Sequence, residues 1–491
     1  MRRSSSAGAP TASVGAASTS TPSGFWNNPK RRAELMLLLM AALITVAAYV
    51  LAALGTTAHM PDDIGPLLGV ILGLSLVPHF ANRWLAPGAS PVMLPIVAFL
   101  NGLGYVIITR LDYHEATLQA GWTAIGVFAY VATLVLIRHS RDLERYRYLI
   151  AFASIGLLFL PLVPHFGVDI GGARLWVKVG PFTFQPVEIG KIGICIFFAS
   201  YLAEKRELLS TPTTRVGNFL VLDPRPIAPL LLTWGVSILI MTAERDVGFS
   251  LLVFCVFLFM LWTATGKTSY LAIGAILFVA ATFVGAHLFT QVNERIAVWI
   301  DPWKYSATTG YQLVQAQYAF GSGGLAGTGL GLGHPDVIPV VTSDFIFAAI
   351  GEEMGLLGTT IVLMAFLALI GTGLRIARAA RSDFAKLVAA GLTVTIGLQT
   401  FFILAGVIRV LPLTGMALPF VAYGGSSLLA NYVLVALLMR ISDEGARTVA
   451  VRPPTPPPPR ATAPVSPGAA LAQNHPMADT GSPEGPKKAT S

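Results

Sequence analysis

Stretches of about 20 apolar residues recur along this chain, and they limit its fold more than any other feature. An α-helix of that length crosses the hydrocarbon core of a bilayer. Only 12% of the 491 residues are charged, against about 25% in an ordinary soluble domain, and 54% are hydrophobic. These values exclude a soluble globular enzyme, a disordered chain and a coiled coil. We therefore expect an all-α polytopic membrane protein.

The apolar runs predict about twelve transmembrane helices. They are expected near residues 33–55, 64–81, 90–109, 117–137, 148–164, 188–203, 228–243, 247–265, 269–290, 345–374, 385–408 and 425–441. Residues 33–441 would then form one transmembrane domain. The segments 1–32 and 442–491 are too polar to pack, and the second is rich in proline, so both are expected to be disordered tails.

The distribution of Lys and Arg predicts the orientation of the chain. With the N-terminus inside, the inner loops contain about twice as many Lys and Arg residues as the outer loops, as the positive-inside rule requires. Both tails are therefore expected to be cytoplasmic. The net charge of +8 comes from short basic clusters between apolar runs. This pattern indicates contact with membrane lipids and no nucleic-acid partner.

Two predicted outer loops, 165–187 and about 291–344, are long and rich in Gly and aromatic residues, which favours ordered, functional loops. In the second loop, Asp301 lies between two tryptophans of the kind found at the membrane–water interface. It is either a partly desolvated general base or the first residue of an Asx–Pro turn. The glycine-rich stretch 321–333 offers backbone N–H groups that would suit a pyrophosphate.

Several ionisable residues are expected at or within the membrane, where they are costly and often functional. Glu188 and Lys191 lie at i, i+3 on one helix face and are expected to pair, for either a functional or a purely structural purpose. Glu244, Arg245 and Asp246 form either a polar turn or a set of partly buried groups that face a cavity.

Three further acids surround the start of the tenth predicted span. Asp344 is expected to N-cap that helix. At least one of Glu352 and Glu353 must face the protein interior, because adjacent helical residues point about 100° apart.

Several short motifs stand out between about residues 145 and 440. They are Gly172–Trp176 with Gln185–Lys191, Glu244–Gly248, Gly310–Gln315, Ser343–Ala348 with Gly351–Gly355, and Leu411–Phe420 with Tyr423–Ser427. Together they resemble the SEDS family (shape, elongation, division and sporulation) of RodA, FtsW and SpoVE proteins. The additional N-terminal spans resemble the longer actinobacterial form, and the arrangement favours a RodA-like protein.

This resemblance implies a peptidoglycan glycosyltransferase that polymerises lipid II at the outer face of the bacterial cytoplasmic membrane, for elongation or division. The GlcNAc 4-hydroxyl of the acceptor would attack C1 of the donor MurNAc, and undecaprenyl pyrophosphate would leave. It also implies a divalent cation, Mg or Mn, with unknown ligands, and a class B penicillin-binding protein as partner. The alternatives are a lipid II flippase and a non-catalytic scaffold for that transpeptidase.

The resemblance also suggests where the substrate binds. The residues expected to contact it are Arg174, Lys178, Glu188, Lys191, Arg245, Asp246, Gln312, Asp344, Glu352, Arg409, Ser426 and Ser427. One departure matters, because the place of the family's usual loop aspartate is taken by Tyr305, and tyrosine is a poor base at neutral pH. Either Asp301 takes over as the general base, or the protein is catalytically weak.

Overall fold

The computed structural model describes residues 28–451, apart from 61–63, 171–172, 180–181, 211–213, 217–218 and 222–227. The two predicted tails lie largely outside these residues, as does motif residue Gly172. The α-helices are α1 (Pro29–Thr57), α2 (Ile64–Leu85), α3 (Met93–Leu111), α4 (Tyr113–Leu136), α5 (Ser140–Arg145), α6 (Arg147–Phe159), α7 (Val187–Ser210), α8 (Ala228–Ala243), α9 (Val247–Thr265), α10 (Ser269–Leu288), α11 (Thr290–Ile300), α12 (Tyr311–Gly323), α13 (Ile346–Ala379), α14 (Asp383–Val407) and α15 (Gly425–Val451). The short elements are the 3₁₀ turns η2 (Leu160–Leu162), η3 (Trp303–Tyr305) and η4 (Pro335–Val337) and the strands β1 (Gly167–Ile170), β2 (Ala173–Val179), β3 (Phe182–Phe184), β4 (Thr214–Val216) and β5 (Phe219–Val221).

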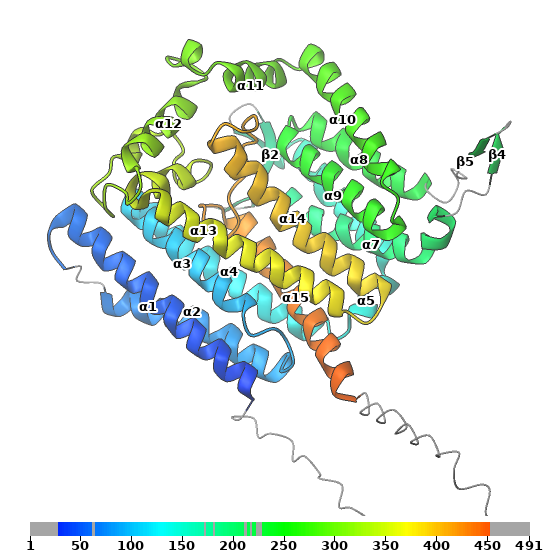
Figure 1. The fold of residues 1–491 in the computed structure, drawn as a ribbon, viewed down its shortest axis with the longest axis horizontal. Coiled ribbons are helices and arrows are strands. Elements are labelled where there is room, and N and C mark those ends of the chain that lie inside the picture. The colour runs from blue at the N-terminus through cyan, green and yellow to red at the C-terminus, as the bar shows by residue number, and fades with distance from the viewer. Residues whose placement is uncertain are drawn as a thin grey trace, which may run out of the picture. The chain divides into compact units, whose positions relative to one another are not determined.

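A helix occupies each of the ranges predicted as spans (Figure 1). Within the described part of the chain, seven helices are long and apolar enough to cross a membrane: α1, α3, α4, α9, α13, α14 and α15. Helices α6, α8 and α10 carry shorter apolar stretches. The chain is thus a multi-pass membrane protein, while a count of twelve spans stays a prediction.

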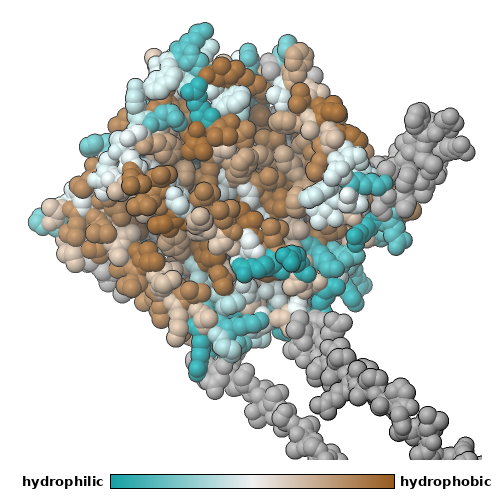
Figure 2. Space-filling view, viewed as in Figure 1, coloured by the Kyte–Doolittle hydropathy of each residue, from teal (hydrophilic) through white to brown (hydrophobic). Residues whose placement is uncertain are grey.

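The surface fits a lipid environment. Apolar side chains cover much of the middle of the face seen in Figure 2, and polar ones gather toward its ends. Large apolar residues exposed on the helices include Leu232 and Leu239 of α8 and Ile276 of α10. An apolar surface of this extent is unusual for a soluble monomer and expected within a bilayer.

The centre of the fold is built from α7, α9 and α14, which pack against one another. Gly391 of α14 shows how closely they approach, since a Cβ there would lie 2.6 Å from Sγ of Cys195 and 2.8 Å from Sδ of Met260. Helix α13 packs on α14 and on α3, and α1 packs along α3 at the edge of the molecule (Figure 1). The chain's first two helices therefore lie apart from its centre.

Helix α1 begins at Pro29, four residues before the predicted boundary. The Asn28 side chain accepts a hydrogen bond from the Lys30 N–H at 3.1 Å and donates one to the Pro87 carbonyl at 3.0 Å. Asn is a favourable N-cap, and proline suits the first helical position. Arg31 is also buried, so this part of the predicted tail belongs to the folded domain.

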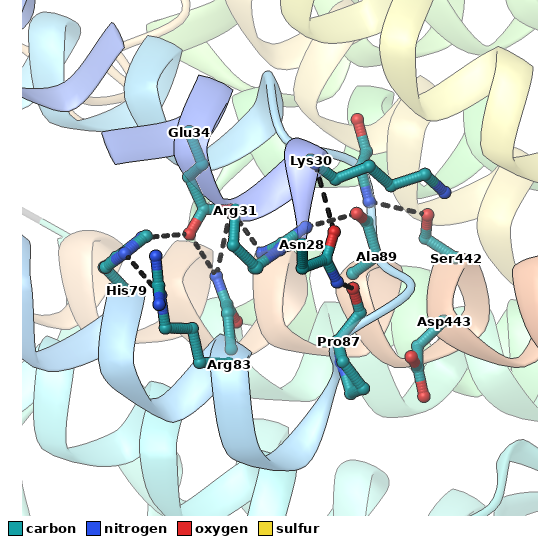
Figure 3. Close-up of polar contacts among 12 residues, drawn as sticks. Asn28, Lys30, Arg31, Glu34, His79, Arg83, Pro87, Ala89, Ser442 and Asp443 are labelled. Carbon is teal, nitrogen blue, oxygen red and sulfur yellow. Dashed lines mark hydrogen bonds and ion pairs between the residues drawn. The ribbon is translucent and has the colours of Figure 1, made fainter. Parts of the chain in front are cut away.

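The end of the molecule where α1 begins carries a cluster of charged and polar groups, here called the tail-end cluster. It contains Arg31, Glu34, His79 and Arg83 (Figure 3), together with Asn82. Glu34 is fully buried, with one oxygen 2.5 Å from Arg31 and the other 2.7 Å from Nδ1 of His79. Asn82 donates to Glu34 at 3.4 Å, and Nε of Arg83 donates to Nε2 of His79 at 3.1 Å. The cluster ties α1 to α2.

The link between α2 and α3 is held by α15 at the same end. The Gly88 N–H donates to Asp443 at 2.7 Å, and the Ser90 N–H donates to Ser442 at 3.0 Å. The carbonyl of Ala89 in this link accepts a hydrogen bond from the Arg31 side chain. The N-terminal helices are therefore anchored to the last helix of the fold.

The opposite end, here called the loop end, carries both long predicted loops. The all-α class holds for the membrane domain, and the loop adds a small feature that was not predicted: β1, β2 and β3 form an antiparallel sheet within 165–187, with Val168 paired to Trp176 and Lys178 to Thr183. Aromatic and β-branched residues in β2 favour a strand over a helix. The second loop contains α11, η3, α12 and η4, as its composition suggested, and β4 and β5 form a separate hairpin.

Candidate active site

The start of α7 brings a buried ion pair to the loop end. Lys191 Nζ lies 2.5 Å from Glu188 Oε2, as the i, i+3 spacing predicts, and donates to Oε1 of Gln399 in α14 at 2.7 Å. Both charged residues are almost fully buried, and Nζ also faces the ring of Phe249 at 5.3 Å from its centre. The amine is thus held by three neighbours from three helices.

The segment before α7 is fixed by the first turn of α15. Ser426 accepts a hydrogen bond from the Gln185 N–H at 2.8 Å, and Ser427 accepts one from Asn431 at 3.2 Å. Both serines are buried. In this structure they hold the chain that presents Glu188, and their predicted contact with substrate stays a prediction.

The turn between α8 and α9 carries Glu244, Arg245 and Asp246. Asp246 caps α9 by accepting the Phe249 N–H at 2.9 Å, and its second oxygen has no partner among the described residues. Both carboxylate oxygens of Glu244 are buried and also lack a partner in that part of the chain. Burial, with the nearby Asp246 charge, raises the pKa of Glu244 to about 8, and burial raises the pKa of Asp246 to about 6. Asp246 is thus buried, and it lines a cavity, which is the second of the two alternatives offered by the sequence.

Two adjoining cavities open beside this turn. The first, of about 210 Å³, is lined by both polar and apolar residues, among them Gln312 and Asp344. The second, of about 300 Å³, lies among α8, α9, α10 and α11 and is mainly apolar. Asp246 and Arg245 line the second cavity. Arg295, together with Leu413 and Thr414, lines both cavities.

Arg295 is not among the residues that the sequence predicts to contact the substrate. Its side chain donates to the carbonyls of Leu413 and Thr414 at 3.2 and 3.1 Å, and this places the guanidinium between the cavities. A signal was present, because Arg295, Val298 and Trp299 lie at i, i+3 and i+4 and share one face of a helix. All three line the first cavity.

Asp344 does not cap α13, so that expectation is wrong. Phe345 occupies the N-cap position and makes no side-chain cap. The Asp344 carboxylate instead lines the first cavity and accepts a hydrogen bond from the Ser343 hydroxyl at 3.2 Å. Burial raises the pKa of Asp344, partly offset by Ser343 and Arg295.

Asp301 lies at the end of α11 with its side chain exposed. Its Oδ1 accepts the Lys304 N–H at 3.3 Å, which is the Asx–Pro turn that the sequence offered as an alternative. It does not line either cavity described above. Its role as a general base stays a prediction, and the turn accounts for its position.

Glu352 and Glu353 are both buried, as the expectation for at least one of them required. Glu353 pairs with Arg110 at 2.8 Å and accepts the Gly331 N–H, while Glu352 accepts the His334 N–H at 2.9 Å. The glycine-rich stretch therefore wraps around these acids. N–H groups that we expected to be open to a pyrophosphate are bound to the protein itself at these positions.

The remaining predicted cations differ in their surroundings. Arg174 and Lys178 lie exposed on β2, and the Arg174 N–H donates to the Glu244 carbonyl at 3.2 Å, which brings the sheet against the acidic turn. Arg409 donates to the carbonyls of Trp299 and Ile300 at 3.0 and 2.6 Å. It therefore closes the end of α11, beside the first cavity.

The sequence and the fold are similar to those of known proteins. Residues 91–447 match the family of FtsW, RodA and SpoVE, described as cell cycle proteins. The chain belongs to the SEDS family. Its helices α1 and α2 precede the matched residues.

Several SEDS relatives are similar over most of their length. Peptidoglycan glycosyltransferase RodA of Mycobacterium bovis is 41% identical over 435 residues, which cover 86% of this chain and 93% of that protein. The RodA of Mycobacterium leprae is 40% identical with the same coverage. A probable peptidoglycan glycosyltransferase FtsW of Geobacter sulfurreducens is 33% identical and covers 66% of this chain and 84% of its own.

Solved structures of SEDS proteins share the fold. A structure described as showing the coordination of polymerization and crosslinking by a peptidoglycan synthase complex aligns with a TM-score of 0.60 and 25% identity, over 72% of this chain and 97% of its own. The Rod shape determining protein RodA of Thermus thermophilus aligns with a TM-score of 0.52 and 24% identity, over 72% and 96%.

Proposed function

We propose that this SEDS protein is a RodA-like peptidoglycan glycosyltransferase that polymerises lipid II. The observation that carries the proposal is the pair of adjoining cavities, one lined by both polar and apolar residues and one mainly apolar, that share Arg295. A lipid-linked sugar has matching parts in the same order: an apolar chain, a diphosphate and a sugar. The mycobacterial relatives, named as glycosyltransferases, support the same activity.

The lining residues suit each part of such a donor. Phe254, Phe278 and Phe289 give the second cavity an aromatic wall for the prenyl chain. Arg295 lies where the cavities meet and Arg245 lines the second cavity, and their charges would stabilise the negative charge that develops on the departing diphosphate. The sugars would then lie in the first cavity.

The chemistry follows from that placement. The 4-hydroxyl of the acceptor GlcNAc attacks C1 of the donor MurNAc, the bond from C1 to the diphosphate oxygen breaks, and the hydroxyl proton passes to a base. The Glu188–Lys191 pair lines neither cavity described above, so we assign it a positioning role behind Asp246.

A divalent cation, Mg or Mn, is part of this proposal. In the described residues no group of three or more His, Cys, Asp or Glu is arranged to hold a metal. The unpartnered oxygens of Glu244 and Asp246 fit a different mode, in which one or two carboxylates and the substrate's phosphates share Mg²⁺. When bound there, the cation would neutralise charge on the diphosphate.

We further propose that the loop end faces outward, that both tails are cytoplasmic, and that a class B penicillin-binding protein is the partner. The excess of Lys and Arg in the opposite loops supports this orientation. The similarity to a structure of a peptidoglycan synthase complex supports the partner.

Polymerisation of purified lipid II by the purified full-length chain tests the proposal. Glycan strands on a gel, with a divalent cation and without another synthase, are expected. The Arg295→Met variant is the matched control for contaminating synthases, and it should lose the product. Movement of labelled lipid II across proteoliposomes without strands would indicate the flippase. Strands that appear only in Tyr305→Asp would indicate a scaffold.

A further inference from the structure

The proposed glycosyl transfer requires a group that accepts the proton of the attacking hydroxyl, and the inference below rests on that proposed function. Such a base needs an oxygen inside the cavity that the acceptor enters, within hydrogen-bond reach of the hydroxyl. It also needs to be held in place by its neighbours. The acids at the loop end differ sharply in both respects.

Most of these acids are engaged elsewhere. The Asp301 side chain is exposed and closes its own turn. Glu188 is paired with Lys191, while Glu352 and Glu353 accept hydrogen bonds from the glycine-rich stretch. None of these four acids lines the first cavity.

Two carboxylates do line the first cavity, Glu294 and Asp344. Glu294 is exposed on α11, and no contact fixes its carboxylate in the described part of the chain. Asp344 is oriented through Oδ1 by the hydroxyl of Ser343. Its second oxygen remains for a proton from the acceptor.

Gly415 shows where that second oxygen points. A Cβ on Gly415 would lie 3.8 Å from Oδ2 of Asp344 and 3.4 Å from Nη2 of Arg295. The carboxylate and the guanidinium thus face the same small space. It stays open because the glycine at position 415 has no side chain. Both residues line the first cavity, which the acceptor hydroxyl would enter. Gly415 also has φ near +70°, which favours glycine.

We propose that Asp344 is the general base of this glycosyl transfer. Its Oδ2 takes the proton of the acceptor hydroxyl while the hydroxyl oxygen bonds to C1 and the electron pair of the breaking C1–O bond leaves with the diphosphate. Arg295 faces that leaving group from the boundary of the two cavities. Burial raises the pKa of Asp344, which makes its carboxylate a stronger proton acceptor.

The decisive experiment measures polymerisation and lipid II binding by full-length variants. Asp344→Asn keeps the shape of the side chain and should reduce polymerisation about 100-fold or more, with lipid II binding and thermal unfolding retained. Asp344→Glu should restore part of the rate and shift the acid limb of its pH profile. Asp336→Asn, an exposed acid in η4 of the same segment, is the matched control and should leave the rate unchanged.

Normal polymerisation by folded Asp344→Asn would overturn the assignment. So would a large loss in Asp301→Asn with none in Asp344→Asn, which would place the base on the exposed turn. A wild-type chain that binds lipid II but makes no strands would instead overturn the proposed function itself. The two failures are therefore distinguishable.

Discussion

The molecule buries charge at both ends, and the two ends treat it differently. In the tail-end cluster, both oxygens of Glu34 have close partners, Arg31 on one side and His79 on the other (Figure 3). At the loop end, both oxygens of Glu244 and one of Asp246 are buried without a partner in the described part of the chain.

The difference separates a structural cluster from a binding site. A buried carboxylate is tolerated when its partners replace the water it lost, and it is costly when they do not. Unpartnered acids persist where a substrate or cation completes them, which is why shifted pKa values gather at functional sites. We infer that Glu34 serves the fold and that Glu244 and Asp246 serve the ligand.

The largest effect is expected from Lys191→Ala, because the Glu188–Lys191 pair is both fully partnered and next to the site. The change leaves Glu188 and Oε1 of Gln399 buried without their cation. It should reduce the free energy of unfolding by about 3–5 kcal/mol and polymerisation per folded molecule by about 100-fold or more. Thermal unfolding in detergent and a lipid II polymerisation gel measure the two quantities.

A charge-swapped pair, Glu188→Lys with Lys191→Glu, is the control for Lys191→Ala. Recovery of both stability and activity would show that pairing alone matters. Unchanged polymerisation in the single variant would remove this pair from the mechanism.

Glu34→Gln and Glu244→Gln should have opposite effects. Glu34→Gln leaves Arg31 buried without its carboxylate, so the free energy of unfolding should fall by about 3–5 kcal/mol. Its polymerisation per folded molecule should stay within about two-fold, since the site is distant. Glu244→Gln should retain or raise the unfolding temperature and lower polymerisation about ten-fold or more.

Equal destabilisation by the two glutamine variants would contradict the comparison. It would mean that Glu244 has partners that stabilise its charged form.

The stability of the protein should also depend on pH through Glu244. Its pKa is about 8 in the folded protein, against an ordinary value of 4.5. Between these values the folded chain holds a proton that the unfolded chain has released, so the free energy of unfolding falls as the pH rises. The wild-type unfolding temperature should therefore decline from about pH 5 to pH 8. In Glu244→Gln this part of the decline should disappear, which a thermal-unfolding series across pH would show.

The parts predicted from sequence are those that depend on nearby residues. Apolar run length placed a helix at each predicted span, and the i, i+3 spacing correctly paired Glu188 with Lys191. The partners of Glu34 were not predictable in this way, because His79 is 45 positions away and its approach depends on how α1 and α2 pack. The direction of the Asp344 side chain likewise depends on Phe345 taking the N-cap position.

The smallest effect is expected from the N-terminal tail. Residues 1–27 are polar and precede the first helix, and the proposed site is at the other end of the bundle. Their deletion should change polymerisation by less than about two-fold. Removing Asn28 as well should cost about 0.5–2 kcal/mol, because the cap on Lys30 and the bond to the Pro87 carbonyl are lost. The difference in thermal unfolding between the two truncations measures the contribution of the Asn28 cap to stability. A ten-fold loss of polymerisation in the shorter deletion would reveal a regulatory tail.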